Sequence, residues 1–256
     1  MMNFASWLGA GARAPGAYSS VREEREGNRN TAREQKAHFY VAEFLGTAFL
    51  LAVIVGSGIM GERLAGGNAA LVLFVNSTAT GAGLVALILS LGPISGAHFN
   101  PLVTLMMCVR GDLPWRLLPG YVFAQFAGAI AGVVATHGMF ALPLLETASK
   151  ARPGFALMWS EVVATLGLLL VIHRVSRAGV PAVAAAVGCY IAAAYWFTSS
   201  TSFANPAVTL ARSLTDTFTG IRPTDVPGFV VSELLAAGVM VGLVLIGTNE
   251  APTRQV

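Results

Sequence analysis

Two near-copies of one hexapeptide carry the side chains whose types and spacing could do chemistry in this chain. They are Asn100-Pro101-Leu102-Val103-Thr104-Leu105 and Asn205-Pro206-Ala207-Val208-Thr209-Leu210, which lie 105 residues apart. Asn is a preferred N-cap and Pro fits the first helical position, so each copy predicts the start of a short apolar helix. An Asn amide held at such a start offers hydrogen-bond donors to a small molecule.

The composition places these short helices in a membrane. Hydrophobic residues make up 55% of the chain and charged residues only 11%, with a mean hydropathy of +0.66, which is too apolar for a soluble domain of this size. Six apolar segments reach or approach the roughly 20 residues that a helix needs to span a bilayer. They run over residues 38–60, 69–91, 117–140, 155–173, 180–198 and 229–246.

The two halves of the chain match beyond the hexapeptides. Glu43 in the first span corresponds to Glu161 in the fourth, and Gln125 in the third corresponds to Glu233 in the sixth. Because each half holds three spans, the second half must cross the membrane in the opposite sense. The predicted fold is therefore all-α and integral to the membrane, with six transmembrane helices, two re-entrant half-helices and an inverted three-plus-three repeat.

The two half-helices are predicted to meet at Asn100 and Asn205 near the middle of the bilayer. About 10 residues at 1.5 Å each give about 15 Å, which is half of the hydrocarbon thickness. The loops that lead into them, residues 92–97 and 199–202, must then be buried in protein or line a wet cavity. Two helix N-termini that face one point oppose cations, so the arrangement predicts a pore for uncharged hydroxylated solutes.

The positive charges predict the topology. Eleven of the sixteen Lys and Arg residues lie in segments that are cytoplasmic if both termini are cytoplasmic. We expect a flexible cytoplasmic tail at residues 1–37, a channel domain at 38–248 with repeats at 38–140 and 155–248, and a short cytoplasmic tail at 249–256. The net charge of +3 and the interleaved Glu residues of the first tail give no sign of nucleic-acid binding.

Other reactive side chains do not favour enzyme or metal chemistry. Cys108 and Cys189 lack a partner at a metal-ligand spacing, and both are expected to be buried, inert thiols. No Ser–His, Cys–His or Asp–Asp pair occurs at helical spacing within the spans, so we expect no enzyme, cofactor or metal site. A secondary transporter is the alternative, although its coupling carboxylates should lie at the midplane, where this chain has Asn.

The chain resembles the aquaporin or major intrinsic protein family over residues 38–248. The resemblance lies in the inverted repeat and in Ser95-Gly96-Ala97-His98-Phe99-Asn100-Pro101, Asn205-Pro206-Ala207, Glu43 and Glu161. It implies a homotetramer in the lipid of a bacterial inner membrane, with one pore per subunit. It also implies that the two Glu side chains hold the re-entrant loops by accepting backbone N–H bonds. Small residues at a four-residue spacing, which let helices approach closely, are Gly128, Gly132, Gly238 and Gly242.

The chain departs from that family where the solute is selected. Leu102 replaces the usual Ala of the first box, and Val208 stands where the family has Arg after the second Asn-Pro-Ala. Counting from the two Asn residues assigns the other filter positions to Thr80, Ala193 and Ser202. Neighbours that remain open alternatives are Ala192 or Ala194 for Ala193, and Phe203 for Ser202. The filter is thus expected to be wide, weakly polar and uncharged.

Two further residues have more than one interpretation. Arg212 lies one turn beyond Val208 and either caps the outer end of the half-helix, which we favour, or serves as a displaced filter cation. His98 is expected to fix its loop or to line the pore. The wide filter resembles that of bacterial aquaglyceroporins associated with arsenic resistance. This resemblance implies passage of glycerol-like polyols, undissociated arsenite, organoarsenicals and water.

Overall fold

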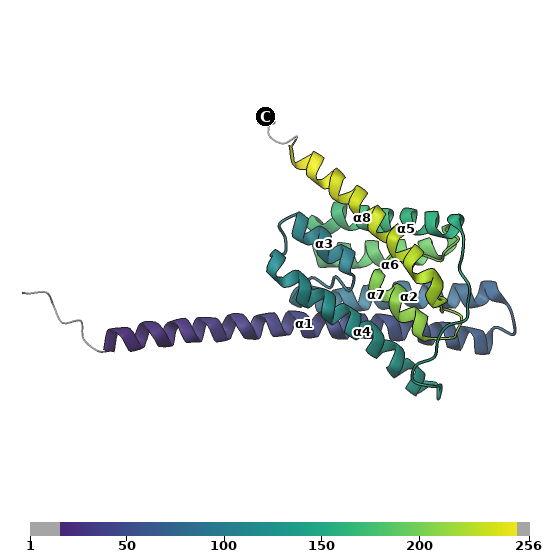
Figure 1. Ribbon diagram of the computed structural model, residues 1–256, viewed down its shortest axis with the longest axis horizontal. Helices are drawn as coiled ribbons and strands as arrows, with labels where there is room; N and C mark the ends of the chain where they lie inside the picture. Colours follow the sequence, from purple (N-terminus) through teal and green to yellow (C-terminus); the bar gives the residue numbers. More distant parts are fainter. Residues whose placement is uncertain (1–15, 250–256) are drawn as a thin grey trace, which may run out of the picture. The chain divides into compact units, whose positions relative to one another are not determined.

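Six long helices dominate the fold. The computed structural model describes the backbone of residues 16–249 and the side chains of residues 36–246, and this part of the chain contains helices and no strand. The six predicted spans are confirmed, with ends that shift by a few residues. They are the Lys36–Leu64 part of α1 (Gly16–Leu64), α2 (Ala69–Ser95), α4 (Leu118–Met139), α5 (Phe155–Val175), α6 (Val180–Phe197) and α8 (Val226–Asn249) (Figure 1).

The first helix starts well before the first span. The chain divides into two compact units, Met1–His38 and Phe39–Val256, and the description below concerns the second. Helix α1 begins at Gly16, whereas the sequence predicts a flexible tail over residues 1–37. Residues 22–36 are rich in Arg and Glu, which have high helix propensity. Residues 1–15, and residues 250–256 of the predicted C-terminal tail, lie outside the described part.

Two short helices begin at the Asn-Pro boxes. Helix α3 (Pro101–Val109) starts after Asn100, whose Oδ1 accepts the Leu102 N–H at 2.9 Å. Helix α7 (Pro206–Ala211) starts after Asn205 and continues as the 3₁₀ turn η4 (Arg212–Leu214). Each therefore extends about nine residues from its Pro, close to the predicted half-span. Three further 3₁₀ turns flank the long helices: η2 (Trp115–Leu117), η3 (Ser176–Ala178) and η5 (Pro223–Asp225).

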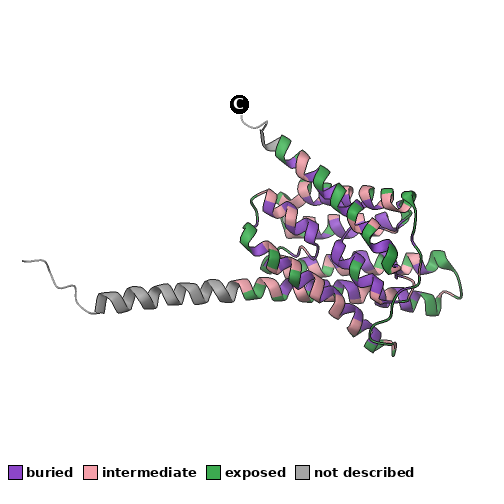
Figure 2. Ribbon diagram, in the orientation of Figure 1, coloured by how far each residue is buried: buried purple, intermediate pink, exposed green. Residues whose placement is uncertain are grey.

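The outward faces of the long helices are apolar, as the membrane assignment requires. Phe123 on α4 is 76% exposed and Phe155 on α5 is 80% exposed, whereas many polar side chains are buried. Figure 2 shows how buried and exposed residues are distributed along the helices. A soluble protein rarely exposes so much apolar surface. Cys108 is buried as expected, but Cys189 is exposed on α6, so the prediction of a buried thiol is wrong at that position.

Helices from the two repeats cross at a pair of glycines. A Cβ on Gly81 of α2 would lie 2.8 Å from the Gly188 carbonyl oxygen of α6, and a Cβ on Gly188 would lie 2.6 Å from the Gly81 carbonyl oxygen. The contact is reciprocal, as expected where two elements related by an inverted repeat meet. This pair was not predicted from the sequence, because neither Gly81 nor Gly188 has a second glycine four residues away.

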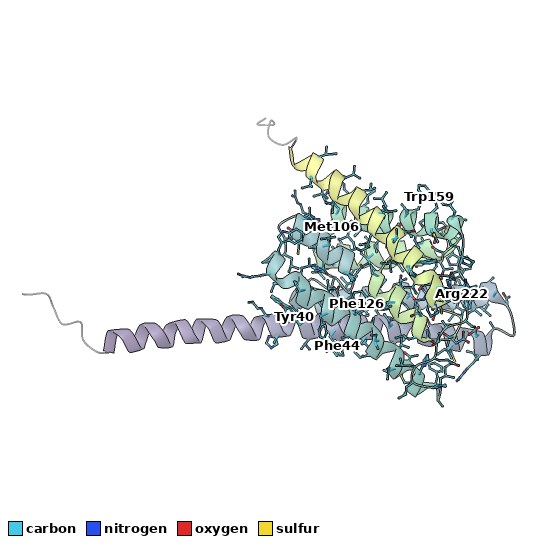
Figure 3. The ribbon with its side chains drawn as sticks, viewed as in Figure 1. Tyr40, Phe44, Met106, Phe126, Trp159 and Arg222 are labelled. Carbon is cyan, nitrogen blue, oxygen red and sulfur yellow. The ribbon has the colours of Figure 1, made fainter. Side chains whose placement is uncertain are left out.

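Helices α1 and α4 also depend on glycine for their close approach. A Cβ on Gly128 would lie 2.3 Å from the carbonyl oxygen of Phe44, a residue labelled on α1 in Figure 3, and one on Gly132 would lie 2.2 Å from the Ala48 carbonyl oxygen. The expected packing role therefore holds for these two glycines. The packing role predicted for Gly238 and Gly242 on α8 is wrong within this chain, because a Cβ added at either position would meet no atom within 4 Å.

Two buried carboxylates hold the loops that lead into α3 and α7. Glu161 accepts the backbone N–H groups of Phe203 at 3.0 Å and Ala204 at 2.8 Å. Glu43 binds the corresponding two amides, 105 residues earlier, and two side chains as well. Its donors are His98 N (3.0 Å), Phe99 N (2.7 Å), Ser95 Oγ (2.7 Å) and Gln125 Nε2 (2.8 Å). These bonds satisfy backbone donors that have no helical partner, which is what non-helical backbone inside a membrane needs.

The same loops carry left-handed residues in matching places. Phe99 and Ala204 have φ of 50° and 49°, and Ala97 and Ser202 have φ of 50° and 49°. Such angles are unfavourable for residues with a Cβ and persist only where surrounding contacts impose them. The carboxylate bonds are therefore a condition for the loop conformation, and through it for the position of both boxes.

We expect Gly132→Ala to destabilise the protein, because its new Cβ must push α1 and α4 apart. Overpacking of this kind costs about 1–3 kcal/mol, although Gly→Ala in an unobstructed helix is stabilising by roughly 0.5–1 kcal/mol. Thermal unfolding in detergent, measured beside Gly238→Ala, tests the sign. Equal melting temperatures for the two variants would contradict the close contact.

Glu43→Gln should also lower the melting temperature, since an amide of the same shape turns an NH₂ group toward the donors that Glu43 accepts. Each buried donor that loses its acceptor costs about 1–3 kcal/mol. The exposed Glu146 provides the control Glu146→Gln, which should leave unfolding unchanged. A Glu43→Gln protein as stable as this control would show that the loop is held by other contacts.

Candidate pore and selectivity site

The two Asn-Pro boxes bind each other across the junction of α3 and α7. The Asn100 Nδ2 donates to the Ala204 carbonyl at 2.7 Å, and the Asn205 Nδ2 donates to the Phe99 carbonyl at 2.8 Å. Each Oδ1 caps its own helix, so one of the two N–H donors of each amide is left after these bonds. The structure thus brings Asn100 and Asn205 together, and the remaining donors are the ones that a small molecule can use.

The other residues of the boxes form the wall of this junction. Pro101, Leu102, Pro206 and Ala207 are all buried. Leu102 is only 2% exposed, and it belongs to the same hydrophobic cluster as Ala207 and Val208. The larger side chain in the first box is therefore accommodated by apolar packing.

His98 and Thr104 form the polar side of the first box. The His98 Nδ1 lies 3.2 Å from the Thr104 Oγ1, which also receives a bond from the Gln125 Nε2 at 2.9 Å. The imidazole lies beside Tyr121, with ring centroids 5.3 Å apart. His98 is half-buried, and these contacts hold its ring beside the loop. Within the described residues no cluster of His, Cys, Asp and Glu could hold a metal ion.

The second repeat has the carboxylate of Glu233 at the position where the first repeat has the amide of Gln125. Glu233 accepts the Asn205 N–H at 3.2 Å and the Thr209 hydroxyl at 2.6 Å. Thr209 corresponds to Thr104, and Glu233 corresponds to Gln125. Both bonds are accepted by the Glu233 Oε1, while its Oε2 is buried and has no hydrogen-bond partner within the described residues.

The predicted filter position on α6 needs a correction. Ala193 is exposed, whereas the side chain of α6 that reaches Thr80 is Tyr195, whose hydroxyl lies 3.3 Å from the Thr80 Oγ1. Of the two alternatives, Ala192 packs against Gly81 and Ala194 is fully buried. A shift of two residues rotates a helical position by about 200°, so counting from Asn205 selected the wrong face. This side of the site carries a phenol rather than a small side chain.

The other positions predicted for the filter, Ser202 and Val208, lie beside the second box. The Ser202 Oγ is buried and has no hydrogen-bond partner within the described residues. Val208 is 3% exposed and offers only apolar surface, while its N–H is directed to the Asn205 Oδ1 at 3.4 Å. Thr80 is 1% exposed. The structure therefore places hydroxyl groups and one apolar residue at these positions.

Arg212 does not cap the end of its half-helix through its side chain. The Arg212 Nε donates to the Thr219 carbonyl, and the guanidinium carbon lies 3.4 Å from the centroid of the Phe203 ring. The side chain is 2% exposed. Arg212 nevertheless occupies the C-cap position of α7, where its backbone N–H donates to the Leu210 and Val208 carbonyls. Phe203 is itself buried and packs edge-on against Phe229, with centroids 5.0 Å apart.

A second arginine, which sequence analysis did not single out, reaches the same ring. Arg152 lies in the loop of residues 140–154, and its guanidinium carbon is 4.9 Å from the Phe203 centroid. Its Nε donates to the Gly220 carbonyl at 2.9 Å and its Nη1 to the Ser200 carbonyl at 3.2 Å. Its backbone N–H donates to Asp225 at 2.7 Å. An available signal was that two basic residues, Lys150 and Arg152, lie close together in this loop.

A third cation lies nearby. The Lys150 ammonium donates to the Phe218 carbonyl at 2.5 Å and lies 4.3 Å from the Phe218 ring centroid. Burial, together with the charges of Arg152 and Arg212, lowers the pKa of Lys150 to about 8. Burial is the largest cause of this lowered pKa, the charges of Arg152 and Arg212 act in the same direction, and Glu62 partly opposes them.

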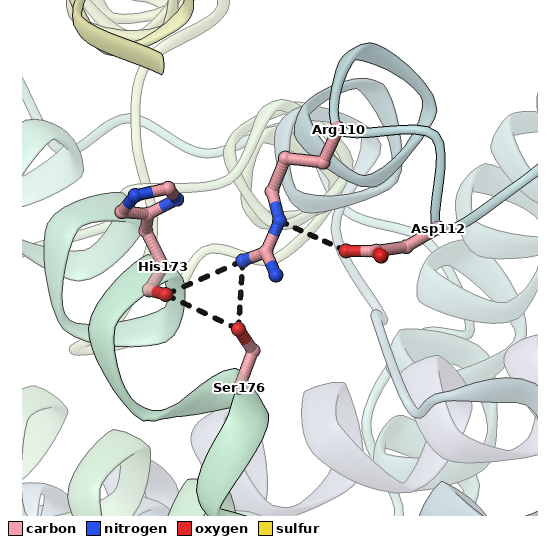
Figure 4. Close-up of polar contacts among 4 residues, drawn as sticks. All are labelled: Arg110, Asp112, His173 and Ser176. Carbon is pink, nitrogen blue, oxygen red and sulfur yellow. Dashed lines mark hydrogen bonds and ion pairs between the residues drawn. The ribbon is translucent and has the colours of Figure 1, made fainter. Parts of the chain in front are cut away.

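The end of α3 is different, because its arginine is paired. The Arg110 Nε lies 2.8 Å from an Asp112 carboxylate oxygen, and its Nη1 donates to the Ser176 hydroxyl at 2.7 Å and to the His173 carbonyl at 3.3 Å (Figure 4). These contacts join the end of α3 to the end of α5. The charge of Arg110 is neutralised locally, so the two ends of the site differ in electrostatics although the repeat relates them.

Comparisons with known proteins agree with this architecture. A relative named as the aquaglyceroporin AqpS of Rhizobium meliloti is 56% identical over 197 residues, which cover 77% of this chain and 84% of that protein. A protein named as a probable glycerol uptake facilitator of Thermotoga maritima is 30% identical over 147 residues, which cover 51% of this chain and 61% of that protein.

A solved structure shares the fold. The aquaglyceroporin from Plasmodium falciparum aligns with a TM-score of 0.66 over 82% of this chain and 94% of its own, at 21% identity. The family model described as Major intrinsic protein matches residues 30–178. Six apolar helices, two opposed half-helices and these matches together show that the chain is an integral membrane protein that belongs to the major intrinsic protein family.

Proposed function

We propose that this protein is a passive transmembrane channel for small uncharged solutes that are larger than water, such as glycerol. The observation that carries the proposal is the reciprocal binding of Asn100 and Asn205, which directs two helix N-termini at one point and leaves one amide donor on each side. Both relatives described above bear names that refer to glycerol or to an aquaglyceroporin.

The junction of the boxes favours neutral solutes over cations. Each half-helix carries a partial positive charge at its N-terminus, so a cation at the junction meets two unfavourable fields. A hydroxylated solute accepts bonds from the remaining amide donors instead. A passive channel needs no further chemistry, and we propose that the protein catalyses no reaction.

The filter composition favours solutes larger than water. Val208 removes the side chain that narrows this position in the family, and Thr80 and Ser202 supply hydroxyl groups. Tyr195 adds a phenol on the α6 side. We include undissociated arsenite, organoarsenicals and water among the proposed solutes. A filter without Arg at residue 208 selects only weakly by size among uncharged molecules.

The sequence also supports a proposal for how the channel is assembled and oriented in the membrane. We propose a homotetramer in the lipid of the bacterial inner membrane with both termini cytoplasmic, which is the topology that the Lys and Arg distribution favours. In that topology α3 ends on the cytoplasmic side and α7 ends on the outer side. The exposed apolar faces of the helices supply the surface for lipid and for neighbouring subunits.

A secondary transporter is the weaker candidate. Coupling to an ion gradient needs an ionisable group that exchanges its ligand near the midplane. The buried carboxylates Glu43, Glu161 and Glu233 instead accept bonds from the backbone of the loops and boxes. A proton or ion that displaced these bonds would release the loops.

Stopped-flow light scattering on proteoliposomes tests the channel proposal. We expect glycerol flux that does not saturate and does not respond to ion gradients. In Val208→Arg, glycerol flux should fall by about tenfold or more relative to water flux, which corresponds to an added barrier of about 1.4 kcal/mol. The long cationic side chain would fill the space that Val208 leaves.

Val208→Leu is the matched control, because it adds bulk without charge or donors. It should reduce glycerol flux less than Val208→Arg does. Saturable uptake driven by an ion gradient would overturn the channel proposal. If Val208→Arg kept the size selectivity of the native protein, residue 208 would not belong to the filter.

A further inference from the structure

Two buried guanidinium groups from distant parts of the chain share one aromatic ring beside the filter. The guanidinium carbons of Arg212 and Arg152 lie 3.4 Å and 4.9 Å from the Phe203 centroid. Arg212 follows α7 and Arg152 belongs to the loop of residues 140–154. This loop is fixed over the end of α7, since the Ala148 N–H donates to the Ser213 carbonyl at 3.0 Å.

Neither guanidinium forms a salt bridge within the described residues, although the buried carboxylate Glu161 acts on both at longer range and Glu233 acts on Arg212. Arg110 at the other end is instead paired with Asp112. The acceptors of the two side chains are the backbone carbonyls of Thr219, Gly220 and Ser200. Carbonyl dipoles and the ring face hold the two like charges but leave their net charge in place.

One hydrogen-bond donor of the Arg212 guanidinium is unsatisfied within the described residues. Its Nη1 is buried and has no hydrogen-bond partner within the described residues. A buried donor without an acceptor is unfavourable, as is a pair of like charges in a low dielectric. Apolar residues would pack at lower cost in these positions. A charge kept at such cost within a membrane protein indicates a functional role.

The pair lies next to the filter in sequence and in space. Phe203 directly follows Ser202, and Arg212 lies one helical turn beyond Val208. The Ser200 carbonyl, which binds Arg152, belongs to the loop that leads into the second box. The positive groups are thus attached to the backbone segments that carry two filter positions, displaced toward the end of α7.

We propose that Arg212 and Arg152, held together on Phe203, supply the fixed positive charge of the solute path that Val208 no longer supplies. This inference rests on the proposed channel function. The displaced pair repels cations at the end of α7, before they reach the half-helix junction, and it presents donors to oxygen atoms of neutral solutes. Since the charge is set back from residue 208, the path there stays wide. The chain thereby combines permissive size selection with rejection of cations.

Urea and guanidinium provide the test, because they are nearly identical in shape and differ by one positive charge. We expect native proteoliposomes to pass urea and to exclude radiolabelled guanidinium. Arg212→Gln should keep urea flux and raise guanidinium uptake roughly tenfold or more, as the loss of one charge beside the path predicts. Arg152→Gln should act in the same direction, and the double variant should exceed both.

Three further variants separate a charge role from a folding role. Arg212→Lys keeps the charge and should exclude guanidinium. Val208→Arg combined with Arg212→Gln should restore exclusion, because it returns a cation to residue 208. Arg63→Gln is the matched control: Arg63 also lies over a ring, that of Phe140 at 5.0 Å, but is exposed, and its loss should leave both fluxes unchanged.

The outcomes distinguish this inference from the channel proposal. Absence of urea flux in native vesicles would count against the channel itself. Native urea flux with unchanged guanidinium exclusion in Arg212→Gln, Arg152→Gln and the double variant would overturn only the role of the arginine pair. If Arg212→Gln lost its fold, Arg152→Gln and Arg212→Lys would still decide, since exclusion must fail in the first and persist in the second.

Discussion

Backbone amides that enter a membrane outside a helix need acceptors from elsewhere, and the rest of this structure depends on two buried carboxylates that provide them. Glu43 and Glu161 each accept two successive N–H groups in the loop before a half-helix, at positions 105 residues apart. These bonds impose left-handed conformations on Phe99 and Ala204. The carbonyls of those same two residues then accept the amides of the opposite box, so the carboxylates indirectly set the geometry of the site.

The inverted repeat makes the scaffold nearly symmetric but leaves the two ends of the site unlike. Gly81 and Gly188 contact each other reciprocally, and the two Asn side chains do the same. At the end of α3, Arg110 is neutralised by Asp112. At the end of α7, unpaired arginines and a lysine of lowered pKa concentrate positive charge. The symmetric backbone therefore positions the two Asn side chains at their junction. A few side chains that differ between the repeats make the end of α7 more positive than the end of α3.

Much of this architecture could be predicted from the sequence because it depends on local rules. Apolar length gave the six spans, and the capping preferences of Asn and Pro gave the starts of α3 and α7. The matched Glu residues pointed to the inverted repeat. The filter assignment of Ala193 was wrong because the direction of a side chain on a helix turns by about 100° with each residue, so a small error in counting selects another face. The packing role predicted for Gly238 and Gly242 was wrong because the spacing of small residues does not show whether another helix lies against them.

The sequence by itself determined the two boxes, the all-helical membrane fold and the presence of Val208 where the family has Arg, since each of these depends on residue type within a short window. Only the tertiary structure decided that Tyr195 reaches Thr80 and that Arg152 and Arg212 meet at Phe203. Thr80 and Tyr195 lie 115 positions apart in the chain, and Arg152 is held by the Ser200 carbonyl, 48 positions away. No local pattern encodes such contacts, because they are set by the packing of whole helices.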